Sequence, residues 1–176
     1  AAARKLIDLD HVSAIVVFGS GTGLSIVDIV EKAQIPTFVI ALSDKVTQGR
    51  RYIYRYFLSA DSIATTLEKE LERRGTSKIA LITSQQEGMM SIRDAFLAGK
   101  HPELAMQESV LPNESDFKTL ATKIAEMKVP AVVALTFGFQ SALLAKQLRT
   151  NKYEGAFASG PQMQLPPMHS AVKQDG

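Results

Sequence analysis

The stretch AIVVFGSGTG, residues 14–23, decides how the chain is expected to fold. Its first five residues are all apolar, which is typical of a strand buried on both faces. Glycines then alternate with Ser20 and Thr22, and a helical pattern of apolar residues follows. A second apolar run, Thr37–Ile40, comes after that helix. The order predicts one parallel strand–helix–strand unit with a right-handed connection.

The rest of the chain alternates strands and helices in the same way, which predicts an open, doubly wound parallel sheet of the α/β class. One weaker, alternating run suggests a strand near the edge of a sheet. Gly75 is well placed to end the helix at 61–74, and Ser115 can cap a later helix. The predicted strands lie at 78–82, 106–111 (the weaker run), 131–135 and 156–158.

Residues 41–51 form a polar break, and an extended aromatic run follows at 52–57. This change suggests two sheets, and a single continuous sheet is the alternative. We therefore expect a partial first lobe over residues 1–51 and a second lobe over residues 52–160. Residues 161–176 would begin a return hinge or a tail.

Composition excludes several classes of protein. The chain has 176 residues, of which 45% are hydrophobic and 22% are charged, as in a soluble globular protein. No apolar run reaches the length of about 18 residues that a membrane span requires. Cysteine is absent, so disulfides, thiolate metal sites and cysteine nucleophiles are excluded. The net charge of +2, without a long Lys/Arg block, argues against a nucleic-acid partner.

No catalytic or cofactor motif fits the glycine-rich loop. A dinucleotide-binding fingerprint fails because Leu24 occupies the position of its third glycine. A nucleophile elbow fails because Gly21 stands where the serine would be, and no Gly-Lys-Ser/Thr of a phosphate-binding loop occurs. The three histidines share no metal-ligand spacing. The sequence therefore predicts a protein without catalytic residues, metal or cofactor, and not an enzyme.

The glycine-rich loop can still bind a ligand. Its glycines allow backbone conformations that bring several N–H groups to the start of a helix, where the helix dipole favours a negative group. Ser20 and Thr22 add hydroxyl donors. Ligand sites of parallel sheets lie at the carboxyl ends of strands, and so does this loop. It could thus hold a carboxylate or a similar polar group, or it could serve only tight strand-to-helix packing.

Four stretches, in this order along the chain, resemble a known family. They are VSAIVVFGSGTGLSIVDIVEKAQIPTFVIALS from residue 12, YIYRYFLSADSIATTLEKELERRGTSKIALITSQQEGMMSIRDAF from residue 52, ESDFKTLATKIAEMKVPAVVALTFGFQSALLAKQLR from residue 114, and GAFASGP from residue 155. Together they resemble the periplasmic leucine/isoleucine/valine-binding proteins, which are substrate-binding components of ABC transporters with the type 1 periplasmic binding fold. The resemblance runs from about Arg4 to Pro161.

The resemblance implies ligand-binding positions in both lobes. Two first-lobe loops would hold the carboxylate and head group of the ligand with hydroxyls and backbone N–H groups. Glu87 occupies the place of an aromatic residue that often covers the ligand, and Gln162 that of an acidic residue that binds an ammonium. Because a neutral amide supplies no such charge, the ligand need not be an amino acid, and amides, carboxylates and aromatic acids all stay open. The implied positions are Ser20, Gly21, Thr22, Ala41, Leu42, Ser43, Glu87, Gly138, Phe139 and Gln162.

The resemblance also implies a mechanism and a setting. Two lobes would close on a small polar solute by a hinge motion. The protein would then deliver the solute to the membrane permease of an ABC importer, from the periplasm or the outside of the cell. The resemblance further implies that the fold is incomplete at both ends, with half of lobe one and most of lobe two present. A ligand-sensing regulatory or receptor domain on the same fold is the alternative function.

Overall fold

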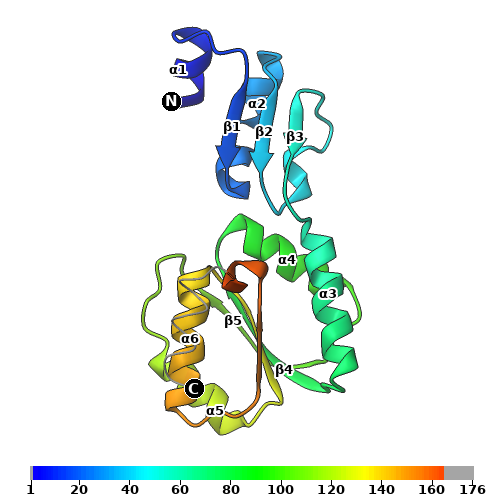
Figure 1. Ribbon diagram of the computed structural model, residues 1–176, viewed down its shortest axis with the longest axis vertical. Helices are drawn as coiled ribbons and strands as arrows, with labels where there is room; N and C mark the ends of the chain where they lie inside the picture. Colours follow the sequence, from blue (N-terminus) through cyan, green and yellow to red (C-terminus); the bar gives the residue numbers. More distant parts are fainter. Residues whose placement is uncertain (1, 165–176) are drawn as a thin grey trace.

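The computed structural model describes residues 2–164, without the side chains of Gln162 and Gln164, and contains two separate parallel sheets placed end to end (Figure 1). The first sheet has the strand order β1-β2-β3, and the second has the order β5-β4-β6-β7. All paired strands run parallel. The predicted α/β class is confirmed, and the alternative of one continuous sheet is excluded.

The first sheet is covered by a helix on one face. Val27 and Val30 of α2 pack with Ile15, Val39 and Ile53 of the three strands into one apolar core. The predicted parallel unit of β1, α2 and β2 is present. The elements of this half are α1 (Ala2–Asp8), β1 (Ile15–Phe18), α2 (Ser20–Lys32), β2 (Thr37–Ile40), the short 3₁₀ helix η1 (Asp44–Val46) and β3 (Ile53–Arg55).

The opposite face of the first sheet is open in the part of the chain that the structure describes. Val16 and Phe18 of β1 each have 70% of their surface exposed, and Phe38 of β2 has 44%. The prediction that the run at 14–18 is buried on both faces was therefore wrong. An apolar run marks a strand, but burial of its second face depends on the elements that pack there.

The strand β3 changes the expected boundary between the lobes. The sequence assigns residues 52–57 to the second lobe, yet β3 pairs with β2 in the first sheet, with Phe38 beside Tyr54. Tyr56 extends this pairing, because its N–H donates to the carbonyl of Val39 (2.9 Å). The chain therefore leaves the first sheet only after residue 56.

The second sheet is covered on both faces, by α3 and α4 on one and by α5 and α6 on the other. Its central strand β4 alternates between the two resulting cores: Ile79 and Leu81 face one, Ala80 and Ile82 face the other, and all four are 0% exposed. The predicted burial of 131–135 is confirmed in β6, and β5 lies at the edge as predicted. The elements of this half are α3 (Ala60–Arg73), β4 (Lys78–Ser84), α4 (Glu87–Ala98), β5 (Glu103–Val110), α5 (Lys118–Met127), β6 (Ala131–Leu135), α6 (Gly138–Thr150), β7 (Ala156–Ser159) and the 3₁₀ helix η2 (Pro161–Gln164).

Two predicted helix boundaries had different outcomes. Gly75 has a φ of +63° just beyond the end of α3, so the predicted glycine stop is confirmed. Ser115 does not cap α5, which begins at Lys118. The carboxylate of Asp116 accepts the N–H of Lys118 instead (3.0 Å), while Glu114 accepts the N–H of Ser115 (2.9 Å). The residue before α5 is Phe117, whose side chain makes no capping hydrogen bond, so the predicted serine cap was wrong.

Candidate functional site

The carboxyl ends of the two sheets face each other where the two halves of the molecule meet (Figure 1). The loops after β1 and β2 lie on the first-sheet side of this junction, and the start of α4, which follows β4, lies on the other side. Open parallel sheets bind their ligands at this edge. The junction is therefore the place at which to examine the residues that the sequence singles out.

Gly19 sets the geometry of the first loop. Its φ of +99° is a conformation that residues with a side chain rarely adopt, so the turn from β1 into α2 requires glycine. The N–H of Gly19 donates to the carbonyl of Ile40 (2.9 Å), which holds the loop beside the end of β2. Gly21 and Thr22 are exposed in the first turn of α2, where N–H groups have no partner within the helix. The positive end of the helix dipole is therefore accessible there.

Ser20 joins the two first-sheet loops. Its side chain is buried, and its Oγ accepts the N–H groups of Leu42 (3.1 Å) and Ser43 (3.2 Å). Both acceptor positions of the hydroxyl are then used, so its hydrogen is what it can offer to a ligand. Ala41, the preceding residue of the second loop, is buried in the core of the first sheet. We call this pair of hydrogen bonds the Ser20 clamp, because it fixes the spacing of the two loops.

The start of α2 and the start of α4 approach each other through glycines. A Cβ atom added to Gly88 would lie 3.0 Å from Cδ1 of Leu42 and 3.1 Å from Oγ of Ser20. A Cβ atom added to Gly21 would lie 3.9 Å from Cβ of Glu87. Leu42 also packs against the core that α3 and α4 form with the second sheet. The halves are thus in contact here, and Gly88, which sequence reasoning missed, allows the close approach.

An ion pair crosses the junction beside these glycines. Nζ of Lys45, in η1, lies 3.1 Å from Oε1 of Glu87, in the first turn of α4. The two side chains are 54% and 23% exposed, so water partly screens the pair. The positive end of the α4 dipole also stabilises the charge of Glu87. Sequence reasoning missed Lys45 because the polar break at 41–51 offered no signal that distinguishes this cation from others.

Three buried hydroxyl groups near the carboxyl ends of the strands have no hydrogen-bond partner among the described residues. They belong to Ser43, after β2, and to Thr83 and Ser84, at the end of β4. Each of these residues is at most 1% exposed. Buried polar groups are normally paired, so these hydroxyls are additional hydrogen-bonding capacity on both sides of the junction.

A chain of hydroxyl groups fixes the start of α6. Oγ of Ser141 lies 2.6 Å from Oγ1 of Thr136 and 2.8 Å from Oγ of Ser159. Ser159 in turn donates to the carbonyl of Ala134 (2.8 Å). The network ties the first turn of α6 to the ends of β6 and β7. This turn carries Phe139, whose surface is 49% exposed.

The structure brings some of the predicted site residues together and leaves others apart. Residues 20–22 and 41–43 lie at the junction with Glu87, through the Ser20 clamp and the close approach of α2 and α4. Phe139 takes no part in those contacts and stands at the start of α6. Gln162 lies in η2, which packs against α6, but its side chain is outside the described residues. Ligand contacts of Phe139 and Gln162 therefore stay predictions.

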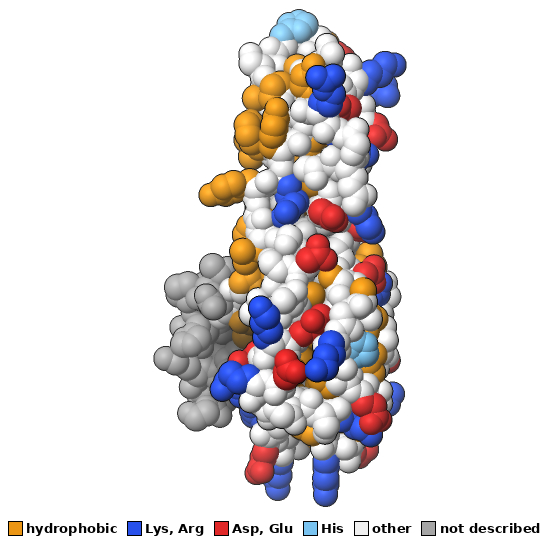
Figure 2. All heavy atoms as spheres, turned by 90° about the vertical axis from the view of Figure 1, so that its right-hand side faces the viewer, with side chains coloured by type: hydrophobic (Ala, Val, Ile, Leu, Met, Phe, Trp, Pro, Cys, Tyr) orange, Lys and Arg blue, Asp and Glu red, His pale blue; other side chains and the backbone are white. Residues whose placement is uncertain are grey.

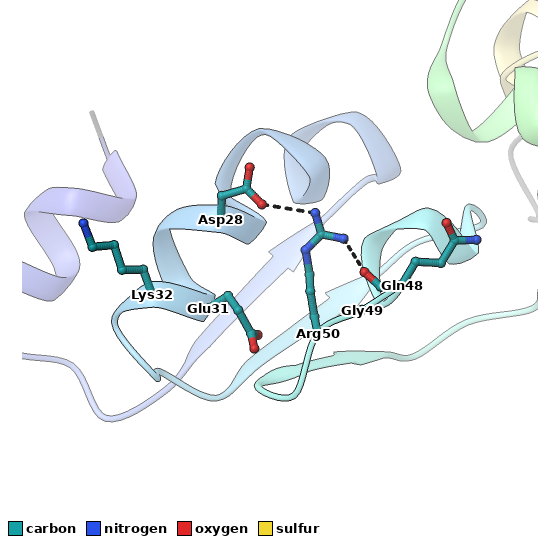
Figure 3. A pocket seen from close by; sticks show the side chains of 6 residues that line it. All are labelled: Asp28, Glu31, Lys32, Gln48, Gly49 and Arg50. Atoms are coloured by element: carbon teal, nitrogen blue, oxygen red, sulfur yellow. Dashed lines mark hydrogen bonds and ion pairs between the residues drawn. The ribbon is translucent and has the colours of Figure 1, made fainter.

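A separate hollow lies on the first half, and the polar side chains that line it bind one another or the neighbouring backbone. It has a volume of about 380 Å³ and lies between α2 and the loop before β3 (Figure 3). Arg50 pairs with Asp28 (3.2 Å) and donates to the carbonyl of Gln48 (2.9 Å). The carboxylate of Glu31 accepts the N–H of Arg51 (2.9 Å). These groups fasten the loop to α2, which gives the hollow a structural role.

Metal-ligand clusters, membrane-spanning helices and shifted pKa values give no further candidate site among the described residues. Among residues 2–164, no group of three or more acidic or histidine side chains is arranged to hold a metal ion. Within the same range, no helix combines the length and apolar character needed to cross a bilayer. Hydrogen bonds from Arg73 and Arg74 lower the pKa of Glu70 to about 2 on the exposed side of α3, and burial raises the pKa of Tyr153 to about 12. Both shifted groups belong to the second half and lie outside the junction contacts.

Comparison with known protein families assigns the chain to one of them. A family model described as periplasmic binding protein matches residues 1–175. The chain belongs to the periplasmic binding protein family. The family and the similar structures are solute-binding proteins rather than enzymes, and the resemblance drawn from the sequence is confirmed. None of the curated protein sequences compared with the chain matches it.

Solved structures share the fold of this periplasmic binding protein. An extracellular ligand-binding receptor from Rhodopseudomonas palustris HaA2 is 19% identical, with a TM-score of 0.89. The branched-chain amino acid transporter substrate-binding protein LivJ from Streptococcus pneumoniae, solved with isoleucine, is 18% identical, with a TM-score of 0.86. An ABC transporter solute-binding protein from R. palustris, solved with benzoate, is 19% identical, with a TM-score of 0.82. Each match covers 98% of this chain and 50% or 51% of the other, so this chain spans about half their length.

Proposed function

We propose that this periplasmic binding protein binds a small polar solute, an amino acid or a related carboxylate or amide, at the junction of its two halves. The Ser20 clamp carries the proposal, because it fixes two loops and the positive end of α2 in front of α4. Isoleucine and benzoate, the ligands of two structures with the same fold, both contain a carboxylate. That shared group supports recognition of an anion by the start of α2.

The proposed site would bind the ligand through hydrogen bonds and would not transform it chemically. The N–H groups of Gly21 and Thr22 would donate to the carboxylate, and the hydroxyl hydrogen of Ser20 would add a third donor. The α2 dipole contributes about 0.3–1 kcal/mol for an anion at its positive end. A ligand ammonium would have to compete with Lys45 for Glu87, whereas an aromatic acid has no such competition. Both ligand classes therefore belong in the test.

The proposed physiological role is the substrate-binding component of an ABC importer. The two halves would close around the solute by a hinge motion, and the ion pair between Lys45 and Glu87 would stabilise the closed arrangement. The protein would act in the periplasm or outside the cell and pass the solute to a membrane permease. Membership of the periplasmic binding protein family supports this role and location.

A ligand-sensing receptor domain is the second candidate function. The structure with a TM-score of 0.89 is an extracellular ligand-binding receptor, which favours keeping this candidate. The two functions share the ligand site but differ in the protein that recognises the closed form. Chemical crosslinking in native membranes distinguishes them, because an importer component links to a permease and a sensor links to a signalling protein.

Saturation-transfer-difference NMR on the chain tests the ligand proposal, since it detects weak as well as tight binding. The panel contains isoleucine, benzoate, 4-hydroxybenzoate and acetamide, with ATP as a ligand of another class. The test variant is Gly21→Asp, which places a negative charge at the carboxylate position, and its matched control is Gly21→Asn. A Cβ atom fits at this position, because its nearest neighbour, Cβ of Glu87, would be 3.9 Å away, and the two variants have side chains of nearly the same size.

The proposal predicts binding of at least one acid of the panel. Gly21→Asp should weaken that binding about tenfold or more, because like charges repel at short distance, whereas Gly21→Asn should change it by less than about threefold. Binding of ATP alone would contradict the proposal. If both variants bound the acid equally well, the ligand site would not be at the start of α2.

A further inference from the structure

The ion pair between Lys45 and Glu87 lies beside the place proposed for the ligand carboxylate. The first turn of α4 brings Cβ of Glu87 to within 3.9 Å of a Cβ atom added to Gly21, at the start of α2. The ammonium of Lys45, which lies 3.1 Å from the Glu87 carboxylate, comes from η1, after β2. Figure 2 shows acidic and basic side chains interspersed around the junction. The charge beside the proposed ligand position therefore depends on one residue from each half.

Without its partner, Glu87 would oppose an anionic ligand. Its side chain is 23% exposed, so water and salt screen its charge less than they screen a surface charge. Like charges repel at short distance, so a free carboxylate here would weaken the binding of a second one by the N–H groups of Gly21 and Thr22. Lys45 neutralises Glu87 and thereby permits a carboxylate at the start of α2.

The same ion pair disfavours a ligand ammonium. In an amino acid the ammonium is bonded to the carbon next to the carboxylate, so a carboxylate held at the start of α2 places the ammonium close by. A desolvated ammonium needs a negative partner, and Glu87 is already paired with Lys45. The neighbouring acid of η1, Asp44, has its carboxylate 3.5 Å from the amide nitrogen of Gln48. An ammonium that displaced Lys45 from Glu87 would also face the repulsion of a second positive charge.

We propose that Lys45 is a specificity-determining residue, through which the site selects carboxylic acids without an ammonium over amino acids. This inference rests on the proposed function, because it assigns a substrate class to the same site. The hydroxyl of Ser43, in the same loop as Lys45, is buried and has no hydrogen-bond partner among the described residues. A hydroxyl can donate to a carboxylate but supplies no negative charge for an ammonium, which agrees with this selection.

Two pairs of ligands that differ only in the ammonium test the proposal. Isoleucine is compared with 3-methylpentanoate, and phenylalanine with 3-phenylpropanoate, by saturation-transfer-difference titrations that give a dissociation constant for each. The preference is the ratio of the two dissociation constants within a pair. The unaltered chain should bind the acid without an ammonium at least about tenfold more tightly in each pair that binds.

Two variants separate specificity from a merely structural ion pair. Lys45→Met leaves Glu87 free to bind the ammonium and to repel the carboxylate, so the preference should fall at least about threefold. Glu87→Gln breaks the same pair but leaves the cation in place, so the preference should stay the same or rise. Lys100→Met, which breaks a pair with Glu72 in the second half, is the matched control and should leave the preference unchanged. Circular dichroism verifies that each variant is folded.

The outcomes distinguish this inference from the proposed function. An amino acid that binds the unaltered chain as tightly as its partner without the ammonium would overturn the inference and leave the proposed function intact. An unchanged preference in Lys45→Met, or an equal fall in Lys45→Met and Glu87→Gln, would overturn it too and assign the ion pair a structural role alone. Binding of no member of either pair would also overturn it, and a benzoate titration under the same conditions would show whether the proposed function fails with it.

Discussion

The two sheets of this protein have the same parallel topology but differ in how they are covered. In the second sheet, residues of β4 alternate between two helical layers, and both sets are fully buried. In the first sheet, only the side toward α2 is buried, and Val16, Phe18 and Phe38 on the other side are exposed among the described residues. The difference shows that an apolar strand sequence indicates only that the strand can be buried. The elements packed against the strand decide whether one face or both faces are covered.

The sharpest test of this contrast compares one residue from each sheet. Leu81→Ala removes a fully buried side chain from β4 and should lower the free energy of unfolding by about 2–5 kcal/mol. Val16→Ala removes a side chain that is 70% exposed and should change it by less than about 0.5 kcal/mol. Urea denaturation at low protein concentration measures both. Equal losses of unfolding free energy in the two variants would contradict the difference in burial between the two sheets.

A pair of glycines tests the packing of the covered side of the first sheet. A Cβ at Gly23 would lie 2.5 Å from Cγ1 of Val39, so Gly23→Ala should destabilise the fold by about 1–3 kcal/mol through overpacking. Gly21→Ala is the control, because the nearest atom would be 3.9 Å away. Its better helix propensity should stabilise the fold by up to about 1 kcal/mol. Thermal unfolding should therefore separate the two variants, and a stabilising Gly23→Ala would be inconsistent with this packing.

The Ser20 clamp is the polar connection between the two loops that follow β1 and β2 in the first half. Ser20→Ala leaves the N–H groups of Leu42 and Ser43 without their acceptor and should cost about 1–3 kcal/mol. Ser25→Ala is the matched control, because this exposed hydroxyl donates only to the carbonyl of Thr22 (2.7 Å). Hydrogen exchange provides the local readout: the amides of Leu42 and Ser43 should exchange faster in Ser20→Ala only. Unchanged exchange there would argue against the clamp.

The ion pair between the halves should give the smallest effect. Lys45→Met removes the partner of Glu87, and a partly exposed pair contributes about 0.2–1 kcal/mol. Lys100→Met is the control, because Lys100 and Glu72 form a pair within the second half, 87% and 69% exposed. The destabilisation by Lys45→Met should shrink in about 1 M salt, where the screening length is about 3 Å. An effect that salt does not change would rule out a Coulombic contribution.

The sequence predicted the buried elements of the second half better than the pairing and burial of the strands in the first sheet. The strand at 131–135 and the glycine stop at Gly75 follow from local composition and backbone conformation, and both are confirmed. The pairing of β3 with β2 could not be read from residues 52–57, because pairing depends on which strand is a neighbour in space. Burial of the run at 14–18 was overestimated for the same reason: the cover of a face comes from distant parts of a chain.

The candidate site was predicted in part. The loops at 19–22 and 41–43 follow from their position after apolar strands, and the structure brings them together. The role of Ser20 as an acceptor between them could not be predicted, because a hydroxyl can serve a ligand or the backbone equally well. Lys45 and Gly88 were missed, since their importance arises only where α4 comes close to the first-sheet loops.

The most direct test of the account is a map of ligand-induced amide shifts. Isoleucine and benzoate are titrated separately into the ¹⁵N-labelled chain, and heteronuclear NMR spectra are recorded at each step. The account predicts that the largest shifts fall on residues 19–22, 42–43 and 87–88, the two clamped loops and the start of α4. Shifts concentrated instead around Asp28 and Arg50, at the separate hollow, would contradict it.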